Sequence, residues 1–133
     1  MSFPEIYRLH SQPTALDRDL VLRCIQECLD CTASCTACAD DCLGDDGVAD
    51  LVRCIRLNLD CADLCDATGR ILTRQTTPNL GVIRASVDAC AVACSACVEE
   101  CELHAAHHEH CRLCAVMCRR CNEVCGELLA TLG

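Results

Sequence analysis

Residues 24–42 read CIQECLDCTASCTACADDC, in which successive cysteines are separated by steps of four, three, four, three and four. Steps of three and four average about 3.5 residues, so in an α-helix these side chains lie along one stripe. The residues between them are mostly polar or small, as on the outward face of a packed helix. The stretch therefore predicts a helix with thiols at the core-facing positions. These thiols are Cys24, Cys28, Cys31, Cys35, Cys38 and Cys42.

Three further segments carry cysteines at similar spacing. The second stripe has Asn58 at one of its positions and holds only three thiols. A single pair at this spacing carries little information, but 18 cysteines in register on four helices predict a shared interior lined with sulfur. The thiols are Cys54, Cys61 and Cys65 in the second segment, Cys90, Cys94, Cys97 and Cys101 in the third, and Cys111, Cys114, Cys118, Cys121 and Cys125 in the fourth.

The ends of the four helices are predicted from residues that favour caps and turns. Thr14, with Asp17 three residues on, predicts a helix start near Ala15, and the Gly44–Gly47 stretch predicts its end. Thr77 before Pro78 predicts the start of the third helix. The stripe breaks near residues 105–108, which predicts the last turn. The expected helices span residues 15–42, 48–74, 78–104 and 109–132.

Short connections make sequential helices antiparallel. We therefore expect an all-α fold, an antiparallel up-down-up-down four-helix bundle with a cysteine-lined core, formed by one domain over residues 1–133. Phe3, Ile6, Tyr7 and Leu9 suggest that the first 13 residues form a short extra helix packed outside the bundle.

Composition and charge exclude several classes of function. A net charge of -9 argues against binding to nucleic acid or to an anionic membrane surface. No uninterrupted apolar run approaches the roughly 18 residues of a membrane span. The N-terminus begins with Met1 and has no apolar segment typical of an export signal, so we expect a complete, cytoplasmic chain. Cytoplasmic thiols stay reduced, which disfavours a disulfide framework and favours metal binding.

The predicted topology gives the two ends of the bundle different chemistry. One end carries imidazoles and carboxylates, from His104, His107, His108 and His110 and from Asp45, Asp46 and Asp50. The other end collects aliphatic side chains, from Leu20, Leu72, Leu80, Ile83, Val87, Leu128 and Leu132. We therefore expect an interior that is closed by aliphatic packing at one end and admits metal at the histidine-bearing end.

Thiolate donors favour soft metals, chiefly Cu(I), and also Zn(II) and iron–sulfur clusters. Burying unpaired thiolates is strongly unfavourable, so the empty chain must hold neutral thiols and metal binding must release protons. Multiple Cu(I) ions, at about one per cysteine, leave a neutral core if each sulfur bridges two ions. Zinc leaves excess negative charge in tetrahedral thiolate sites, and iron–sulfur clusters need discrete ligand sets. The even spacing therefore favours Cu(I).

Other interpretations stay open at this point. Buried cysteines can be inert small hydrophobes, although 18 of them at stripe positions are hard to explain in that way. A thionein-like buffer for zinc or cadmium is one alternative. A thiol redox protein is another, but it needs an accessible cysteine of low pKa. Arg119 and Arg120, beside Cys118 and Cys121, come closest to a basic environment but are expected to face water, and no nucleophile–base arrangement stands apart. We therefore expect a binding protein and not an enzyme.

The expected metal ligands are the 18 cysteines together with His104 and His108. His104 continues the third stripe one step beyond Cys101, and His108 continues that spacing. The sequence assigns no role to His107 or His110. Met117 lies beside the fourth stripe and is expected to fill the core. A buried Asn58 needs a partner, and it either binds metal weakly or sets helix register.

These features resemble those of the bacterial four-helix-bundle copper storage proteins, specifically their cytosolic branch. The resemblance covers residues 15–132 and rests on the four cysteine stripes, the histidine-bearing end and the missing export signal. It implies Cu(I) held in thiolate-bridged sites along the bundle axis, with copper entering at the histidine end. It also implies a homo-oligomer, a tetramer. We expect a copper chaperone or a small-molecule Cu(I) carrier as partner. The three cysteines of the second helix are a departure, which predicts fewer copper sites along that wall.

Overall fold

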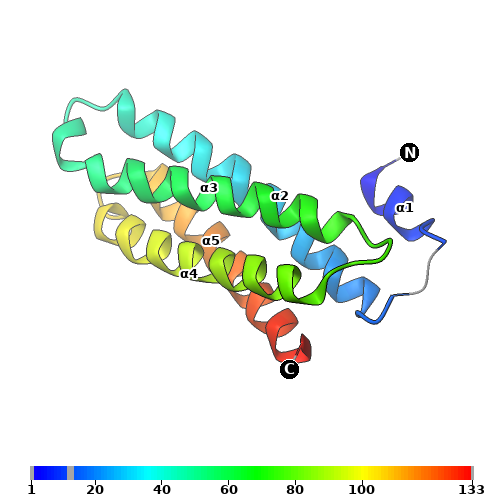
Figure 1. Ribbon diagram of the computed structural model, residues 1–133. Helices are drawn as coiled ribbons and strands as arrows, with labels where there is room; N and C mark the ends of the chain where they lie inside the picture. The colour runs from blue at the N-terminus through cyan, green and yellow to red at the C-terminus, as the bar shows by residue number, and fades with distance from the viewer. Residues whose placement is uncertain (1, 12–13, 133) are drawn as a thin grey trace.

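The computed structural model of the chain describes residues 2–11 and 14–132. Four long helices run alternately in opposite directions, as Figure 1 shows, so the predicted all-α four-helix bundle is confirmed. The helices of the described residues are α1 (Phe3–Arg8), α2 (Arg18–Leu43), the 3-10 helix η1 (Val48–Asp50), α3 (Val52–Thr73), α4 (Leu80–His104) and α5 (Glu109–Leu132).

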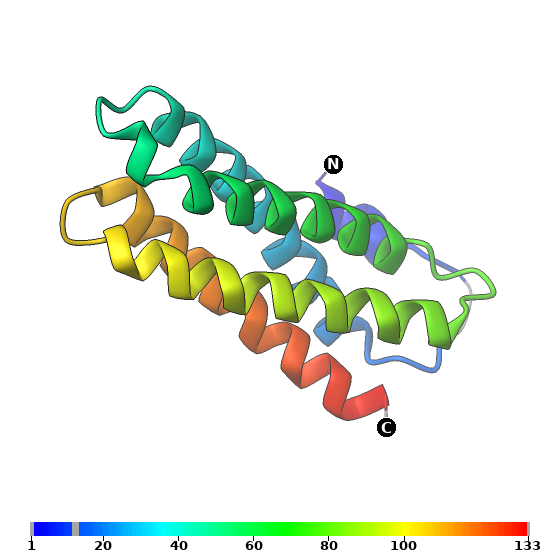
Figure 2. The same ribbon diagram turned by 60° about the vertical axis from the view of Figure 1, so that its left-hand side comes forward.

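Each long helix packs against two others, which encloses a single interior. Helix α2 lies beside α3 and α5, and α4 lies beside the same two helices. The connections at residues 44–51 and 105–108 lie together at one end of the bundle in Figures 1 and 2. We call this the loop end. The predicted histidines lie in or beside the 105–108 connection and therefore belong to this end. The two ends of the chain lie toward the opposite end in both figures.

The first long helix begins three residues later than predicted, because a stronger cap lies downstream. Asp17 caps α2, and its Oδ1 atom accepts hydrogen bonds from the backbone N–H groups of Asp19 and Leu20 at 3.0 and 3.2 Å. Thr14, the predicted cap, instead accepts a hydrogen bond from the N–H of Leu16 at 3.1 Å. A carboxylate is favoured at this position because it also interacts with the helix dipole.

The predicted start of the third long helix is wrong by two residues. Thr77 has a φ of 47°, in the left-handed region, and Pro78 precedes the helix. Asn79 is the cap, since its Oδ1 atom accepts a hydrogen bond from the N–H of Val82 at 3.1 Å, and α4 begins at Leu80. Two polar residues could cap this helix, and the sequence did not distinguish them.

The remaining connections agree with the prediction. The turn at residues 105–108 is confirmed, although it contains neither glycine nor proline. The second predicted helix, residues 48–74, consists of η1 followed by α3. The predicted extra helix near the N-terminus is α1, which contacts α2 and buries Tyr7. Residues 12 and 13 of that segment lie outside the described residues.

Aliphatic side chains close the end of the interior that lies opposite the loop end. Leu72, Ile83, Val87 and Leu128 are at most 2% exposed there, and we call these four residues the aliphatic end. Leu20 and Leu132 pack partly buried against the core. The expectation for Leu80 is wrong. Leu80 is the first residue of α4, and its side chain is 41% exposed.

Helix α4 is, by length and composition alone, apolar enough to cross a membrane. The helix contains no uninterrupted apolar run of about 18 residues and meets this criterion only on its mean hydropathy. An average over a window also counts scattered cysteine, alanine and valine, which are frequent in α4. The buried stripe of α4 packs against α3 and α5, as the core helices of other bundles do. We therefore describe α4 as a bundle helix.

Candidate metal centre

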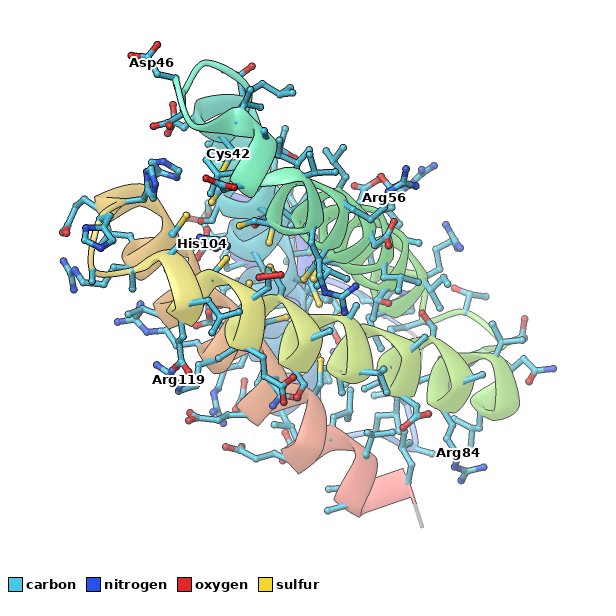
Figure 3. All side chains as sticks on the ribbon, turned by 90° about the vertical axis from the view of Figure 1, so that its left-hand side faces the viewer. Cys42, Asp46, Arg56, Arg84, His104 and Arg119 are labelled. Atoms are coloured by element: carbon cyan, nitrogen blue, oxygen red, sulfur yellow. The ribbon has the colours of Figure 1, made fainter. Side chains whose placement is uncertain are left out.

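All 18 cysteines lie within the described residues, and all are free and buried. Sixteen of them have no exposed surface, and Cys38 and Cys114 are each 2% exposed. Figure 3 views the bundle from the loop end and shows yellow sulfur atoms between the four helices, with Cys42 near the viewer. We call these 18 side chains the thiol core. Its position explains how a chain with very few aromatic residues fills a bundle interior.

Sulfur atoms from different helices lie in contact along this core. Cys35 and Cys118 place their Sγ atoms 3.4 Å apart, and the Sγ atoms of Cys65 and Cys90 are separated by 3.5 Å. At the far end of the row, the Sγ atoms of Cys24 and Cys125 are separated by 3.8 Å. These separations greatly exceed a disulfide bond of about 2.05 Å. Two or more of these sulfurs can nevertheless bind one ion.

The thiols form overlapping groups of four, and within each group the sulfur atoms lie within 4.8 Å of one another. Cys31, Cys35, Cys118 and Cys121 each belong to two groups. A sulfur shared by two groups could bridge two ions, so the core suits a connected array of metal ions better than isolated sites. Five of the groups are Cys28/Cys90/Cys121/Cys125, Cys31/Cys65/Cys94/Cys121, Cys31/Cys35/Cys61/Cys118, Cys35/Cys97/Cys114/Cys118 and Cys38/Cys42/Cys54/Cys111.

Burial keeps thiols near the loop end protonated. It raises the pKa of Cys111 to about 12, and it also raises the pKa of Cys42. In both cases the main cause is the loss of water around the thiolate. Each of these thiols must therefore release a proton when it binds metal at neutral pH.

Asn58 is a buried polar side chain that contacts the thiol core. Its side chain has no exposed surface, and it donates a hydrogen bond through Nδ2 to the carbonyl of Cys54 at 2.8 Å. Its Oδ1 atom accepts from the thiols of Cys114 at 3.0 Å and Cys97 at 3.3 Å. The partner that a buried amide requires is thus provided partly by sulfur. This amide joins α3 to α4 and α5 between the thiols near the loop end and those deeper in the bundle.

The structure brings one histidine into contact with the thiol core. His110 Nδ1 lies 3.4 Å from Cys38 Sγ and 3.6 Å from Cys111 Sγ. The sequence assigned it no role, and we find no signal that could have done so. Its contact with Cys38 comes from a neighbouring helix, and adjacent residues on a helix do not usually face one another.

The two histidines that were expected as ligands contact carboxylates. His104 Nε2 lies 3.4 Å from Glu100 Oε2, and His108 Nδ1 lies 3.5 Å from Asp45 Oδ2. Their rings nevertheless continue toward the core, since the ring centres of His104 and His108 are 6.4 Å apart and those of His108 and His110 are 5.5 Å apart. His107 is exposed. Figure 3 shows His104 at the loop end.

Glu100 is a buried carboxylate that the sequence reading missed. It is 7% exposed, and its Oε1 atom lies 3.5 Å from Nε of Arg53. A buried carboxylate needs partners, and here they are a guanidinium and an imidazole. Glu100 therefore fixes one nitrogen of His104 and leaves the other nitrogen available.

The sequence profile of the copper storage protein family matches residues 17–130, which include all 18 cysteines. The chain belongs to this family. Among solved structures, this copper storage protein is similar to Ccsp from Streptomyces lividans loaded with 10 copper equivalents. That match has 48% identity, covers 97% of this chain and 98% of the other, and has a TM-score of 0.94.

Two further solved structures extend the comparison. One concerns copper loading, with five coppers, of a cytosolic copper storage protein from Streptomyces lividans. It is 54% identical, covers 86% of this chain and 96% of the other, and has a TM-score of 0.85. The other is the Cu(I)-bound copper storage protein BsCsp3, which is 33% identical over 83% of this chain and 98% of the other, with a TM-score of 0.74. This copper storage protein shares its bundle with relatives that have been solved with bound copper.

Proposed function

We propose that the chain stores many Cu(I) ions in its thiol core, as its membership of the copper storage protein family suggests. The observation that carries the proposal is the overlap of the four-thiol groups. Bridging sulfurs let Cu(I) accumulate to about one ion per cysteine while the interior stays neutral. All 18 cysteines are proposed ligands.

The histidines have graded roles in this proposal. His110 supports ligation best, because its Nδ1 atom lies within reach of two thiols. His104 and His108 are proposed as weaker ligands farther out, each held through one ring nitrogen by a carboxylate and free at the other. A second-sphere carboxylate of this kind orients a metal-binding imidazole.

The wider role follows from the same chemistry and from the relatives. We propose a cytosolic storage protein without catalytic activity, made of one domain over residues 1–133. A homo-tetramer is proposed from the family resemblance. Copper exchange with a chaperone or a small-molecule Cu(I) carrier is proposed because the metal must reach a buried core.

A metal competition tests the storage function. Reduced apo protein is loaded anaerobically with Cu(I) and is then exposed to excess Zn(II). In the converse experiment, zinc-treated protein receives Cu(I). We expect Cu(I) to displace Zn(II) completely and Zn(II) to displace no Cu(I), as measured by metal content after gel filtration. Preferential retention of zinc would favour a thionein-like buffer instead.

A further inference from the structure

A cleft of about 190 Å³ opens on the side of the bundle between α2 and α5. Ala37, Cys38 and Asp41 line it from α2, and His110, Cys114 and Met117 line it from α5. The cleft therefore lies between two neighbouring helices, in the part of each that is nearest the loop end. It brings together a thioether, an imidazole and two thiols, all donors that soft metal ions accept.

The burial pattern of the thiols singles out this cleft. Cys38 and Cys114 line it, and they are the two cysteines with any exposed surface. The thiols nearest the loop end are better covered, since Cys42, Cys54 and Cys111 have no exposed surface. Leu51, at the connection between η1 and α3, is itself only 1% exposed and belongs to the core at that end.

The cleft also connects directly to the deeper thiols. Cys114 Sγ lies 3.7 Å from Cys35 Sγ and 3.9 Å from Cys118 Sγ. Both of these sulfurs belong to four-thiol groups deeper in the bundle. An ion bound at the cleft can therefore move inward by exchanging one sulfur ligand at a time.

Resting on the proposed storage function, we propose that Cu(I) enters the thiol core through this α2–α5 cleft, with Met117 as the first ligand. A neutral thioether accepts Cu(I) from a carrier without losing a proton, and the carboxylate of Asp41 attracts the cation. The ion then passes to Cys38 or Cys114. The carrier leaves as free ligand when the thioether binds the ion. In the second exchange a Cu–thiolate bond forms, the Cu–thioether bond breaks and the thiol releases its proton to solvent, and copper remains Cu(I) throughout.

Two exposed alanines offer a matched pair of variants. Ala37 lines the cleft, and Ala106 is exposed on the turn at the loop end, close in sequence to the histidines. Ala37→Phe narrows the cleft, whereas Ala106→Phe places the same bulk at the loop end. Met117→Leu removes the sulfur and conserves the volume of the side chain, so it separates ligation from packing.

The experiment mixes each reduced apo protein with Cu(I)–bicinchoninate and follows the loss of the chelate's colour by stopped flow. We expect Ala37→Phe and Met117→Leu to slow uptake by about tenfold or more, which corresponds to about 1.4 kcal/mol or more in the barrier to entry. Ala106→Phe should take up copper at the rate of the unchanged chain, and all variants should reach the same final copper content.

If both Ala37→Phe and Met117→Leu take up copper at the unchanged rate, copper does not enter through the cleft. A full final copper content in the same experiment would still support storage. Selective slowing by Ala106→Phe would instead place the route at the loop end. Failure of the unchanged chain to take up copper refutes storage itself.

Discussion

At the scale of single residues, Asn58 shows what the thiol core requires of its neighbours. It occupies a stripe position between Cys54 and Cys61, where the spacing of α3 would accommodate another cysteine. Its amide accepts hydrogen bonds from thiols of α4 and α5. Asn58 thus places an amide at a position where a cysteine would otherwise lie. The amide accepts hydrogen bonds from protonated thiols but binds soft metal ions less strongly than a thiolate does.

Asn58→Cys should therefore increase the copper capacity. The new thiol would lie at the step that is missing from α3, and we expect about one additional tightly bound Cu(I) per chain, since bridging thiolates set the capacity. The control is Ser95→Cys, which adds a thiol on the exposed face of α4. Anaerobic titration against a Cu(I) chelator measures both. A capacity that does not change in Asn58→Cys would mean that the row of thiols does not determine the number of ions.

The protonation of buried thiols predicts how the stability of the apo protein depends on pH. The folded-state pKa of Cys111 is raised from 9.0 to about 12. The folded chain therefore holds a proton that the unfolded chain releases, and this stabilisation is complete below pH 9 and is lost as the pH rises toward 12. We expect the free energy of unfolding of reduced apo protein, measured anaerobically in urea, to be lower near the top of this window than at neutral pH. Equal or greater stability there would contradict the assignment of neutral buried thiols.

At the scale of helices, the core-facing stripe of each long helix carries the proposed metal-binding side chains in one part and aliphatic packing in the other. Toward the loop end the stripes carry sulfur, and toward the aliphatic end they carry leucine, isoleucine and valine. Thr68 marks the change on α3, where its hydroxyl pairs with that of Ser86 on α4 at 2.8 Å. Aliphatic packing can therefore hold the four helices together before any metal binds.

Leu128→Ala tests this division of roles. The side chain of Leu128 has no exposed surface, and truncation of a buried leucine costs about 2–5 kcal/mol. We expect a loss of that size in the apo free energy of unfolding, with the copper capacity unchanged wherever the variant folds. Leu59→Ala is the control, because Leu59 is 44% exposed and its removal should change stability little. If both variants lose the same stability, the aliphatic end does not hold the apo bundle together.

Helix boundaries show where sequence reasoning fails at this scale. Periodicity located all four long helices, because a stripe of 18 thiols is a strong signal. The starts of α2 and α4 were misplaced by two or three residues, because Thr14 and Thr77 compete with Asp17 and Asn79 as caps. Which of two neighbouring polar residues caps a helix depends on the path of the preceding chain, and local sequence does not fix that path.

At the scale of the whole molecule, the bundle surrounds a reactive interior with a nearly closed wall. The placement of the thiols in one core followed from spacing and antiparallel topology. The contact between His110 and Cys38, the buried carboxylate of Glu100 and the α2–α5 cleft depend on how far each helix is rotated about its axis. Rotations of a few tens of degrees decide such contacts, and a sequence pattern does not specify them that finely.

The measurement that tests the central claim most directly is the number of Cu(I) ions bound per chain. Reduced apo protein is titrated anaerobically with Cu(I) in competition with a chromophoric chelator, and bound metal is counted against the 18 cysteines. The account predicts tight binding that saturates near one ion per cysteine, because bridging sulfurs let a neutral copper–thiolate array fill the bundle. Saturation at only a few ions, with most thiols still reactive toward alkylating reagents after unfolding, would contradict it.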